Sequence, residues 1–279
     1  EKNVFNIAVE GNFDDCQNLV KAMFADKSFS KEIKMSGVNS INWARIIAQS
    51  VYYFYSYFLL EDKNKPINFS VPTGNFGDVY AGYLAKKIGL PINKFIVATN
   101  QNDILHRAIT NGSYYVENVS ETISPSMDIQ IASNFERLIF DLHDHNDKKT
   151  IDVMKGIKEK GKYEINKENL DRINVDFLSS RMDENEILNT IQTVYKKYDK
   201  ILDPHSAIGY GAFDKVNLKG NNIVLATAHP SKFPNAIVKA INIKSELPEK
   251  LAFTLDKKEN YDIIDNNLNK IKQHIRERI

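Results

Sequence analysis

The chain has 279 residues, and its 37 lysines and arginines balance 36 aspartates and glutamates to a formal net charge of +1. This balance excludes a dedicated nucleic-acid binder, which would carry a clear excess of positive charge. Hydrophobic residues make up 42% and charged residues 26%, which are ordinary proportions for a folded protein, so a wholly disordered chain is excluded as well.

Apolar runs of strand length alternate with segments of helical periodicity along the chain. The predicted strands cover residues 4–9, 67–71, 94–99 and 223–227. The predicted helices cover residues 16–24, 43–58, 78–89, 103–109, 135–142, 184–197 and 234–241. The order strand, helix, strand, helix between residues 67 and 109 is typical of parallel β-α units, so the sequence predicts an α/β fold.

The most apolar stretch, residues 46–60, is too short to cross a membrane. It includes Gln49, Ser50 and Ser56, whereas a bilayer requires about 20 mostly apolar residues. We therefore expect a buried helix and no membrane partner. The single cysteine, Cys16, cannot form an intramolecular disulfide; this fits a reducing compartment, and a cytoplasmic location is expected.

A glycine-rich turn, TGNFGD at residues 73–78, joins the buried strand at 67–71 to the helix that follows it. Such a turn directs backbone N–H groups and a helix N-terminus at one point, which is a good phosphate site. The turn lacks the Gly-Lys-Ser/Thr of a Walker loop and the G-x-G-x-x-G of a dinucleotide site. The alternative is a tight turn that needs glycine only for its backbone geometry.

Two other places carry small polar groups suited to anions. Ser40 and Asn42 lie at the start of a predicted helix, with Arg45 close enough to share an anion; alternatively Ser40 is an N-cap and Arg45 a surface charge. Thr227 follows a buried strand, at the end where parallel sheets bind ligands. His229, two residues later, is more often a packed or capping group than a catalyst.

The sequence does not favour a zinc site or an acyl-transfer hydrolase. Asp141, His143, Asp144 and His145 are close in sequence, but they lie in polar, loop-like text and are expected to be solvated rather than to bind zinc. The G-x-S-x-G turn of acyl-transfer hydrolases is absent.

Six segments together resemble bacterial-type threonine synthase, in that family's order and over nearly the whole chain. They are EGNFDDCQ at 10–17, NSIN at 39–42, PTGNFGD at 72–78, SPSMDIQIASNFERLIFDL at 124–142, DPHSAIGY at 203–210 and TAHPSKF at 227–233. The resemblance implies a fold-type II pyridoxal-phosphate enzyme, similar to the tryptophan synthase β subunit, with an open, mostly parallel sheet flanked by helices. It also implies a carbon–oxygen lyase that converts O-phospho-L-homoserine and water to L-threonine and phosphate.

The resemblance assigns roles to individual residues. Four would hold the phosphate of pyridoxal 5'-phosphate through backbone amides: Gly74, Asn75, Phe76 and Gly77. The Thr227 hydroxyl would bond the pyridine nitrogen, leaving it less protonated than a carboxylate would. Three residues would hold the substrate phosphate: Ser40, Asn42 and Arg45.

One family feature is missing. The lysine that forms the Schiff base, in a motif of the type F-K-D, has no match here, and neither Lys232 nor Lys94 fits it. We therefore expect a C-terminal portion that is inactive alone, because covalent catalysis requires that amine. Within the portion, residues 1–35 would end the smaller domain, 36–242 would form the large cofactor-binding domain with a helical insertion at about 124–200, and 243–279 would be a helical tail.

Two alternatives stay open from the sequence. One is a threonine-synthase-like phospholyase, which eliminates phosphate from a similar substrate without making threonine. The other is a non-catalytic phosphate-binding fragment. The sequence fixes neither an oligomeric state nor an effector site.

Overall fold

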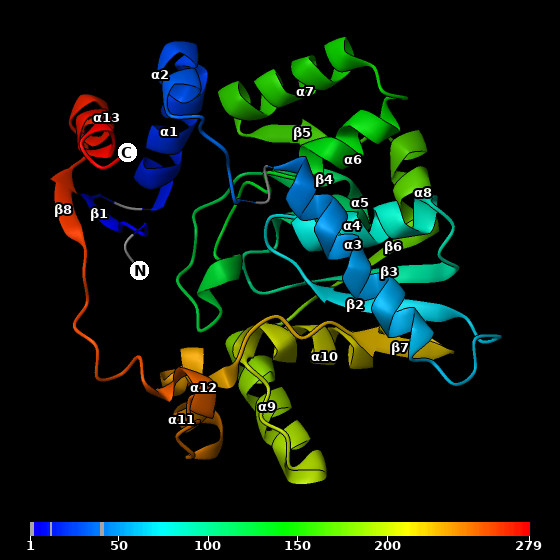
Figure 1. Cartoon of the computed structure of the whole chain (residues 1–279). Coiled ribbons are helices and arrows are strands. Elements are labelled where there is room, and N and C mark those ends of the chain that lie inside the picture. The colour runs from blue at the N-terminus through cyan, green and yellow to red at the C-terminus, as the bar shows by residue number, and fades with distance from the viewer. Residues whose placement is uncertain (1–2, 12, 40–41) are drawn as a thin grey trace. The chain divides into compact units, whose positions relative to one another are not determined.

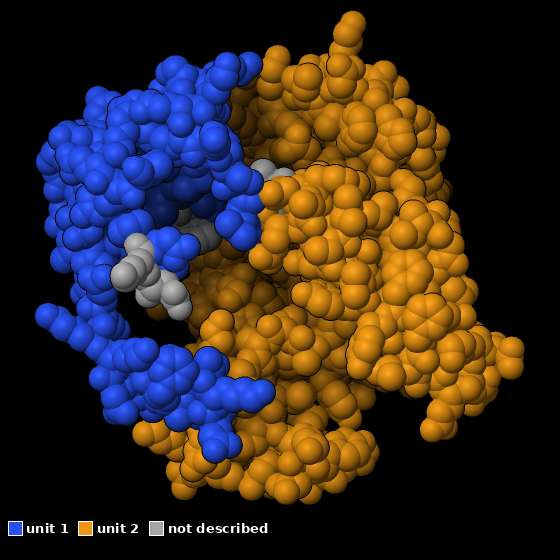
Figure 2. All heavy atoms as spheres, in the orientation of Figure 1, with its two compact units in different colours: residues 1–38, 247–279 blue, residues 39–246 orange. Residues whose placement is uncertain are grey.

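The computed structural model describes residues 3–11, 13–39 and 42–279, which fall into two compact units. One unit comprises Glu1–Val38 with Leu247–Ile279, and the other comprises Asn39–Glu246, as Figure 2 shows by colour. The domain boundaries expected near residues 36 and 243 stay predictions; the compact units change at residues 39 and 247.

A four-stranded parallel sheet forms the centre of the larger unit (Figure 1). Its strands, in spatial order, are β6 (Phe177–Arg181), β3 (Ile92–Thr99), β2 (Ile67–Pro72) and β7 (Asn221–Val224). All six residues of β2 are buried, as expected of a central strand covered on both faces. The parallel α/β architecture predicted from the sequence is confirmed.

Alternating side chains of β2 and β3 form two hydrophobic cores, one on each face of the sheet. Phe69 and Val71 of β2, with Phe95 and Val97 of β3, lie in the larger core. Helices α3 (Trp43–Phe58), α4 (Gly77–Lys87), α5 (Ile104–Asn111), α6 (Phe135–Leu142) and α8 (Lys167–Asp176) contribute to it. Ile96 belongs to the second core, with α9 (Glu184–Tyr198), α10 (Pro204–Val216) and α11 (Pro234–Ile241).

The polar segment near residues 144–169 contains helix as well as loop. Helix α7 (Asp147–Lys160) and helix α8 flank the short strand β5 (Lys162–Glu164), which pairs antiparallel with β4 (Ser113–Tyr115). Only Thr150 and Ile157 of α7 are buried, so the helix has too narrow an apolar stripe to be predicted from periodicity.

Helix α3, which was expected to be a buried helix, is buried on one face only. Ile46, Ser50 and Tyr53 are buried, while Ile47 and Val51 are exposed. The buried face packs on α4, where Gly82 leaves room for the Tyr53 ring. None of the helices in the described residues is long and apolar enough to cross a membrane.

The smaller unit joins the beginning and the end of the chain. Strand β1 (Ile7–Glu10) pairs in parallel with β8 (Asp262–Asp265), so the expected helical tail contains a strand as well as helices. Its helices are α1 (Phe13–Ala25), α2 (Lys27–Glu32), α12 (Glu249–Ala252) and α13 (Leu268–Arg276). Leu19, Met23, Phe29 and Ile271 form its core.

Candidate functional site

The carboxyl ends of all four strands of the larger sheet lie at the same edge. The register pairs Pro72 with Ala98 and Thr99 with Arg181, so the loops that leave β2, β3 and β6 begin side by side. Ligands of open parallel sheets bind outside this edge. The predicted glycine-rich turn leaves β2 here and leads directly into α4.

The turn prepares the start of α4 for an anion. Phe76 occupies the N-cap position in the left-handed conformation, with φ 69°, and makes no side-chain capping bond. Its ring is fully buried, 5.2 Å from the Phe135 ring, which holds this strained backbone in place. The Gly77 N–H donates to the side chain of the exposed Asn75 at 3.0 Å. The start of α4 thus follows a glycine-rich turn at the carboxyl edge of the sheet, an arrangement in which backbone N–H groups and a helix N-terminus can bind phosphate.

Gly74 is required by a close approach of backbone. A Cβ at this position would lie 2.9 Å from the Ser126 carbonyl oxygen and 3.3 Å from the Met127 Cα. The loop that contains Ser126 thus packs directly against the turn, and any side chain at position 74 would displace this loop.

A buried polar network ties that loop to the end of β3. The Asn100 amide donates to Ser124 at 2.9 Å and to Asp128 at 2.8 Å, and the Asn102 amide donates to the same Asp128 oxygen at 2.9 Å. The Thr122 N–H donates to the other Asp128 oxygen at 2.8 Å. Sequence reasoning missed this network because its members come from two segments; the only sequence signal was the polar NQND text after a buried strand.

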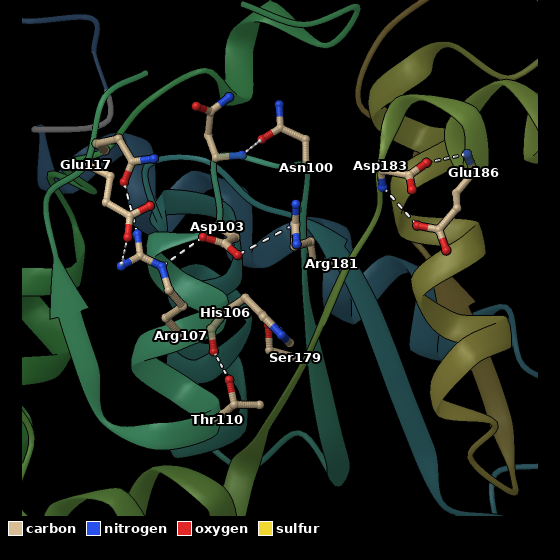
Figure 3. Close-up of polar contacts among 12 residues, drawn as sticks. Asn100, Asp103, His106, Arg107, Thr110, Glu117, Ser179, Arg181, Asp183 and Glu186 are labelled. Atoms are coloured by element: carbon tan, nitrogen blue, oxygen red, sulfur yellow. Dashed lines mark hydrogen bonds and ion pairs between the residues drawn. The ribbon is translucent and has the colours of Figure 1, made fainter. Parts of the chain in front are cut away.

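An ion-pair cluster lies beside this network at the ends of β3 and β6 (Figure 3). Asp103 contacts Arg107 at 2.8 Å and Arg181 at 3.5 Å, and Arg107 also reaches Glu117 at 3.2 Å. Because Asp103 pairs with Arg107 of α5 and with Arg181 of β6, the cluster links the first part of this helix to the end of β6.

Asp78, the residue after the turn, has a perturbed carboxyl group. Burial raises its pKa to about 6, although the Tyr53 hydroxyl, which donates to it at 3.1 Å, acts in the opposite direction. The same hydroxyl lies 2.9 Å from the Asp78 carbonyl oxygen. A carboxyl group that gains its proton easily avoids repelling an anion at the adjacent N–H groups.

Two of the three predicted substrate-phosphate residues, Asn42 and Arg45, lie at the start of α3. Asn42, rather than Ser40, is the N-cap of this helix, and its side chain accepts the Ala44 N–H at 3.0 Å. Arg45 is exposed in the first turn. Ser40 lies outside the described residues.

Trp43 connects the start of α3 to the rest of the site. Its ring lies 6.4 Å from that of Tyr80 in α4 and 5.3 Å from the Arg137 guanidinium. These residues line a cavity of about 490 Å³ together with Asn134, whose N–H donates to the Asn75 carbonyl at 2.9 Å. The cavity is therefore next to the glycine-rich turn and large enough for a small molecule.

Strand β7 ends at Val224, whereas the predicted strand at 223–227 ends at Thr227. Thr227 therefore lies three residues beyond the strand, and it is exposed. Its backbone N–H donates to the Ser206 hydroxyl at 3.0 Å. His229 caps the short helix at Pro230–Lys232 by accepting the Ser231 N–H, so the capping interpretation of this histidine is confirmed. Across the described residues, no group of three histidine, cysteine or acidic side chains could hold a metal.

Comparison with known proteins yields matches over nearly the whole chain. A family model described as the C-terminal part of threonine synthase matches residues 206–275. The threonine synthase of Pseudomonas aeruginosa is 44% identical over 98% of this chain and 59% of its own length. The crystal structure of threonine synthase from Brucella melitensis with bound pyridoxal phosphate superposes with a TM-score of 0.92 at 45% identity, over 99% of this chain and 60% of that one.

The yeast threonine synthase structure gives a TM-score of 0.87 at 38% identity, over 100% of this chain and 60% of that one. The chain thus spans about three fifths of the length of the relatives it matches. Its larger unit has the same parallel α/β fold as these structures. The chain is therefore similar to threonine synthases over nearly all of its length, and residues 206–275 correspond to their C-terminal part.

Proposed function

We propose that the carboxyl edge of the larger sheet binds pyridoxal 5'-phosphate. Gly74, Asn75, Phe76 and Gly77 hold its phosphate through backbone N–H groups, and the Thr227 hydroxyl meets the ring nitrogen. The observation that carries this proposal is the glycine-rich start of α4 at the carboxyl edge of the sheet, where the Ser126 backbone lies so close to Gly74 that no side chain fits. The 45% identity to a threonine synthase with bound pyridoxal phosphate supports it.

The substrate of the complete protein is O-phospho-L-homoserine. Ser40, Asn42 and Arg45 hold its phosphate, where the Arg45 guanidinium contributes planar, charge-assisted donors. When bound, the cofactor stabilises negative charge on the substrate carbons as protons are removed. The neutral Thr227 hydroxyl keeps the ring nitrogen less protonated than a carboxylate would, which suits proton transfers made one at a time before phosphate departs.

The reaction is the conversion of O-phospho-L-homoserine and water to L-threonine and phosphate. It is tested by incubating the longer protein that contains these residues with this substrate and measuring both products. We expect threonine and phosphate in equal amounts. Phosphate accompanied by a 2-oxo acid would identify a phospholyase instead, and no turnover of any phosphorylated amino acid would leave only the non-catalytic alternative.

We further propose that residues 1–279 alone form no threonine, because their sequence contains no lysine in a motif of the type F-K-D and two candidate lysines do not fit the role of cofactor anchor. Lys94 is on β3 and donates to the Asn174 carbonyl at 2.8 Å. Lys232 is exposed at the end of a short helix. Borohydride reduction of the active longer protein, followed by peptide mapping, should label no lysine of residues 1–279; labelled Lys232 would contradict this.

A further inference from the structure

A buried group of three polar residues begins helix α10, in the segment DPHSAIGY. Asp203 is 1% exposed, His205 4% and Ser206 2%. Neither the phosphate-binding turn nor the ring-nitrogen residue accounts for this group. Burying an acid, an imidazole and a hydroxyl together is costly unless each has a hydrogen-bond partner.

The Asp203 carboxylate is the centre of the group. One of its oxygens accepts from His205 Nδ1 at 3.0 Å and from the His205 N–H at 2.9 Å. The other accepts a hydrogen bond from the Ser206 hydroxyl. Burial alone would raise the pKa of Asp203, but the hydrogen bonds from His205 and Ser206 outweigh it and hold the pKa below its ordinary value of 3.8.

Each partner of Asp203 passes the contact on to the candidate cofactor site. His205 Nε2 accepts the Ser126 N–H at 3.3 Å, and Ser126 is the residue whose carbonyl backs Gly74. This bond needs a bare Nε2, so the ring proton lies on Nδ1, facing Asp203. The Ser206 hydroxyl gives its own proton to Asp203 and accepts the Thr227 N–H at 3.0 Å.

The first turns of α10 pack closely against the sheet, which holds these contacts in place. Gly209 packs so closely on the sheet that a Cβ would lie 3.0 Å from Pro72 and from Val224, the residues that end β2 and β7. Its carbonyl accepts the Ser70 hydroxyl at 2.6 Å. The His205 ring also packs on Phe233, with the ring centroids 4.7 Å apart.

We infer that Asp203, His205 and Ser206 are positioning residues that align the two halves of the cofactor site, the Gly74 turn through Ser126 and the ring-nitrogen residue Thr227 through its backbone. The inference rests on the proposed function. The Asp203 carboxylate thereby fixes the distance between the Gly74 turn, which holds the cofactor phosphate, and Thr227, which meets the cofactor ring. A rigid ligand requires this distance to be constant.

The test compares the wild-type protein with three variants. Ser206→Ala removes the hydroxyl, Ser206→Thr keeps it, and Ser50→Ala is a matched control. Ser50 is also a buried serine of the larger unit, and its hydroxyl bonds only a nearby carbonyl of α3 in the contacts described. Two quantities are measured: the dissociation constant of pyridoxal phosphate, and the hydrogen-exchange rate of the Thr227 amide against that of β3 amides.

We expect Ser206→Ala to weaken pyridoxal phosphate about tenfold and to speed exchange at Thr227 by a similar factor, with β3 amides unchanged. Ser206→Thr should restore both, and Ser50→Ala should change neither. Faster exchange throughout the unit would indicate a purely structural role and overturn the inference, as would a Thr227 amide that exchanges at the wild-type rate.

The exchange measurement needs no cofactor, so it separates two failures. A wild type that binds no pyridoxal phosphate contradicts the proposed function, whatever the amides do. A wild type that binds it, beside a Ser206→Ala variant that binds equally well, contradicts only the positioning role.

Discussion

The close packing of α3 on α4 predicts opposite effects for the same substitution at two helical glycines. At Gly82 in α4, an added Cβ would lie 2.4 Å from a Tyr53 ring carbon and 2.7 Å from a Phe95 ring carbon. At Gly156 in α7, nothing lies within 4 Å of the added atom. Gly82→Ala should therefore destabilise the larger unit, while Gly156→Ala should stabilise it.

Both variants share the gain of replacing glycine by alanine in a helix, which is about 1 kcal/mol. Gly82→Ala also overpacks the core, at a typical cost of about 1–3 kcal/mol. The cost should be near the upper end, since Tyr53 and Phe95 are fully buried and their ring centroids are 6.1 Å apart. The net expectation is a loss of about 1–2 kcal/mol for Gly82→Ala and a gain of about 1 kcal/mol for Gly156→Ala.

Urea unfolding followed by tryptophan fluorescence measures both effects. Trp43 is the single tryptophan of the chain, and it lies in α3 beside α4. With a urea m-value of about 2 kcal/mol/M, the midpoints should move by about 0.5 M or more in opposite directions. A Gly82→Ala variant as stable as wild type would refute the packing described for these helices.

Three further predictions concern charged groups. Burial raises the pKa of Asp78 to about 6, so the folded state holds the proton of this carboxyl group more tightly than the unfolded state does. As the pH rises from about 4 to 7, wild type should therefore lose stability relative to Asp78→Asn. Urea midpoints measured across that pH range would show no such divergence if the pKa of Asp78 were ordinary. The pKa of Asp203 is lowered instead, so the stability advantage of wild type over Asp203→Asn should be full near neutral pH and should shrink below pH 3.8. An advantage that does not change with pH in acid unfolding would contradict this prediction. Arg45→Ala in the longer protein should raise KM for O-phospho-L-homoserine at least about tenfold, in steady-state assays with Lys65→Ala as a surface control, and an unchanged KM would remove Arg45 from the substrate site.

The sheet could be predicted from the sequence because its central strands are continuous apolar runs. The segments 67–71 and 94–99 were expected as strands, and β2 and β3 cover them. Strand β6 was missed because only Phe177 and Ser180 of its five residues are buried, which leaves too little pattern to recognise.

Helix α10 was missed for a different reason. Its glycines lower helix propensity, and nearly all of its first nine residues are buried, so it has no amphipathic period. The structure explains both features, since Gly209 meets Pro72 and Gly211 meets Met182 at distances that leave no space for a larger residue.

The glycine-rich turn between β2 and α4 could be predicted because its four residues are contiguous and follow a buried strand. The groups that hold it in place could not, because they depend on contacts between distant segments. The Ser126 N–H and His205 are separated by 79 positions, and Thr227 and Ser206 by 21. Only the folded chain brings these pairs together.

Equilibrium titration of pyridoxal phosphate into wild type, Gly74→Ala and Gly156→Ala is the most direct test of the proposed cofactor site. Gly74→Ala places a carbon 2.9 Å from the Ser126 carbonyl, whereas Gly156→Ala meets no neighbour. The account predicts that Gly74→Ala binds the cofactor at least about tenfold more weakly than wild type and that Gly156→Ala binds it equally well. Equal binding by wild type and Gly74→Ala would contradict it.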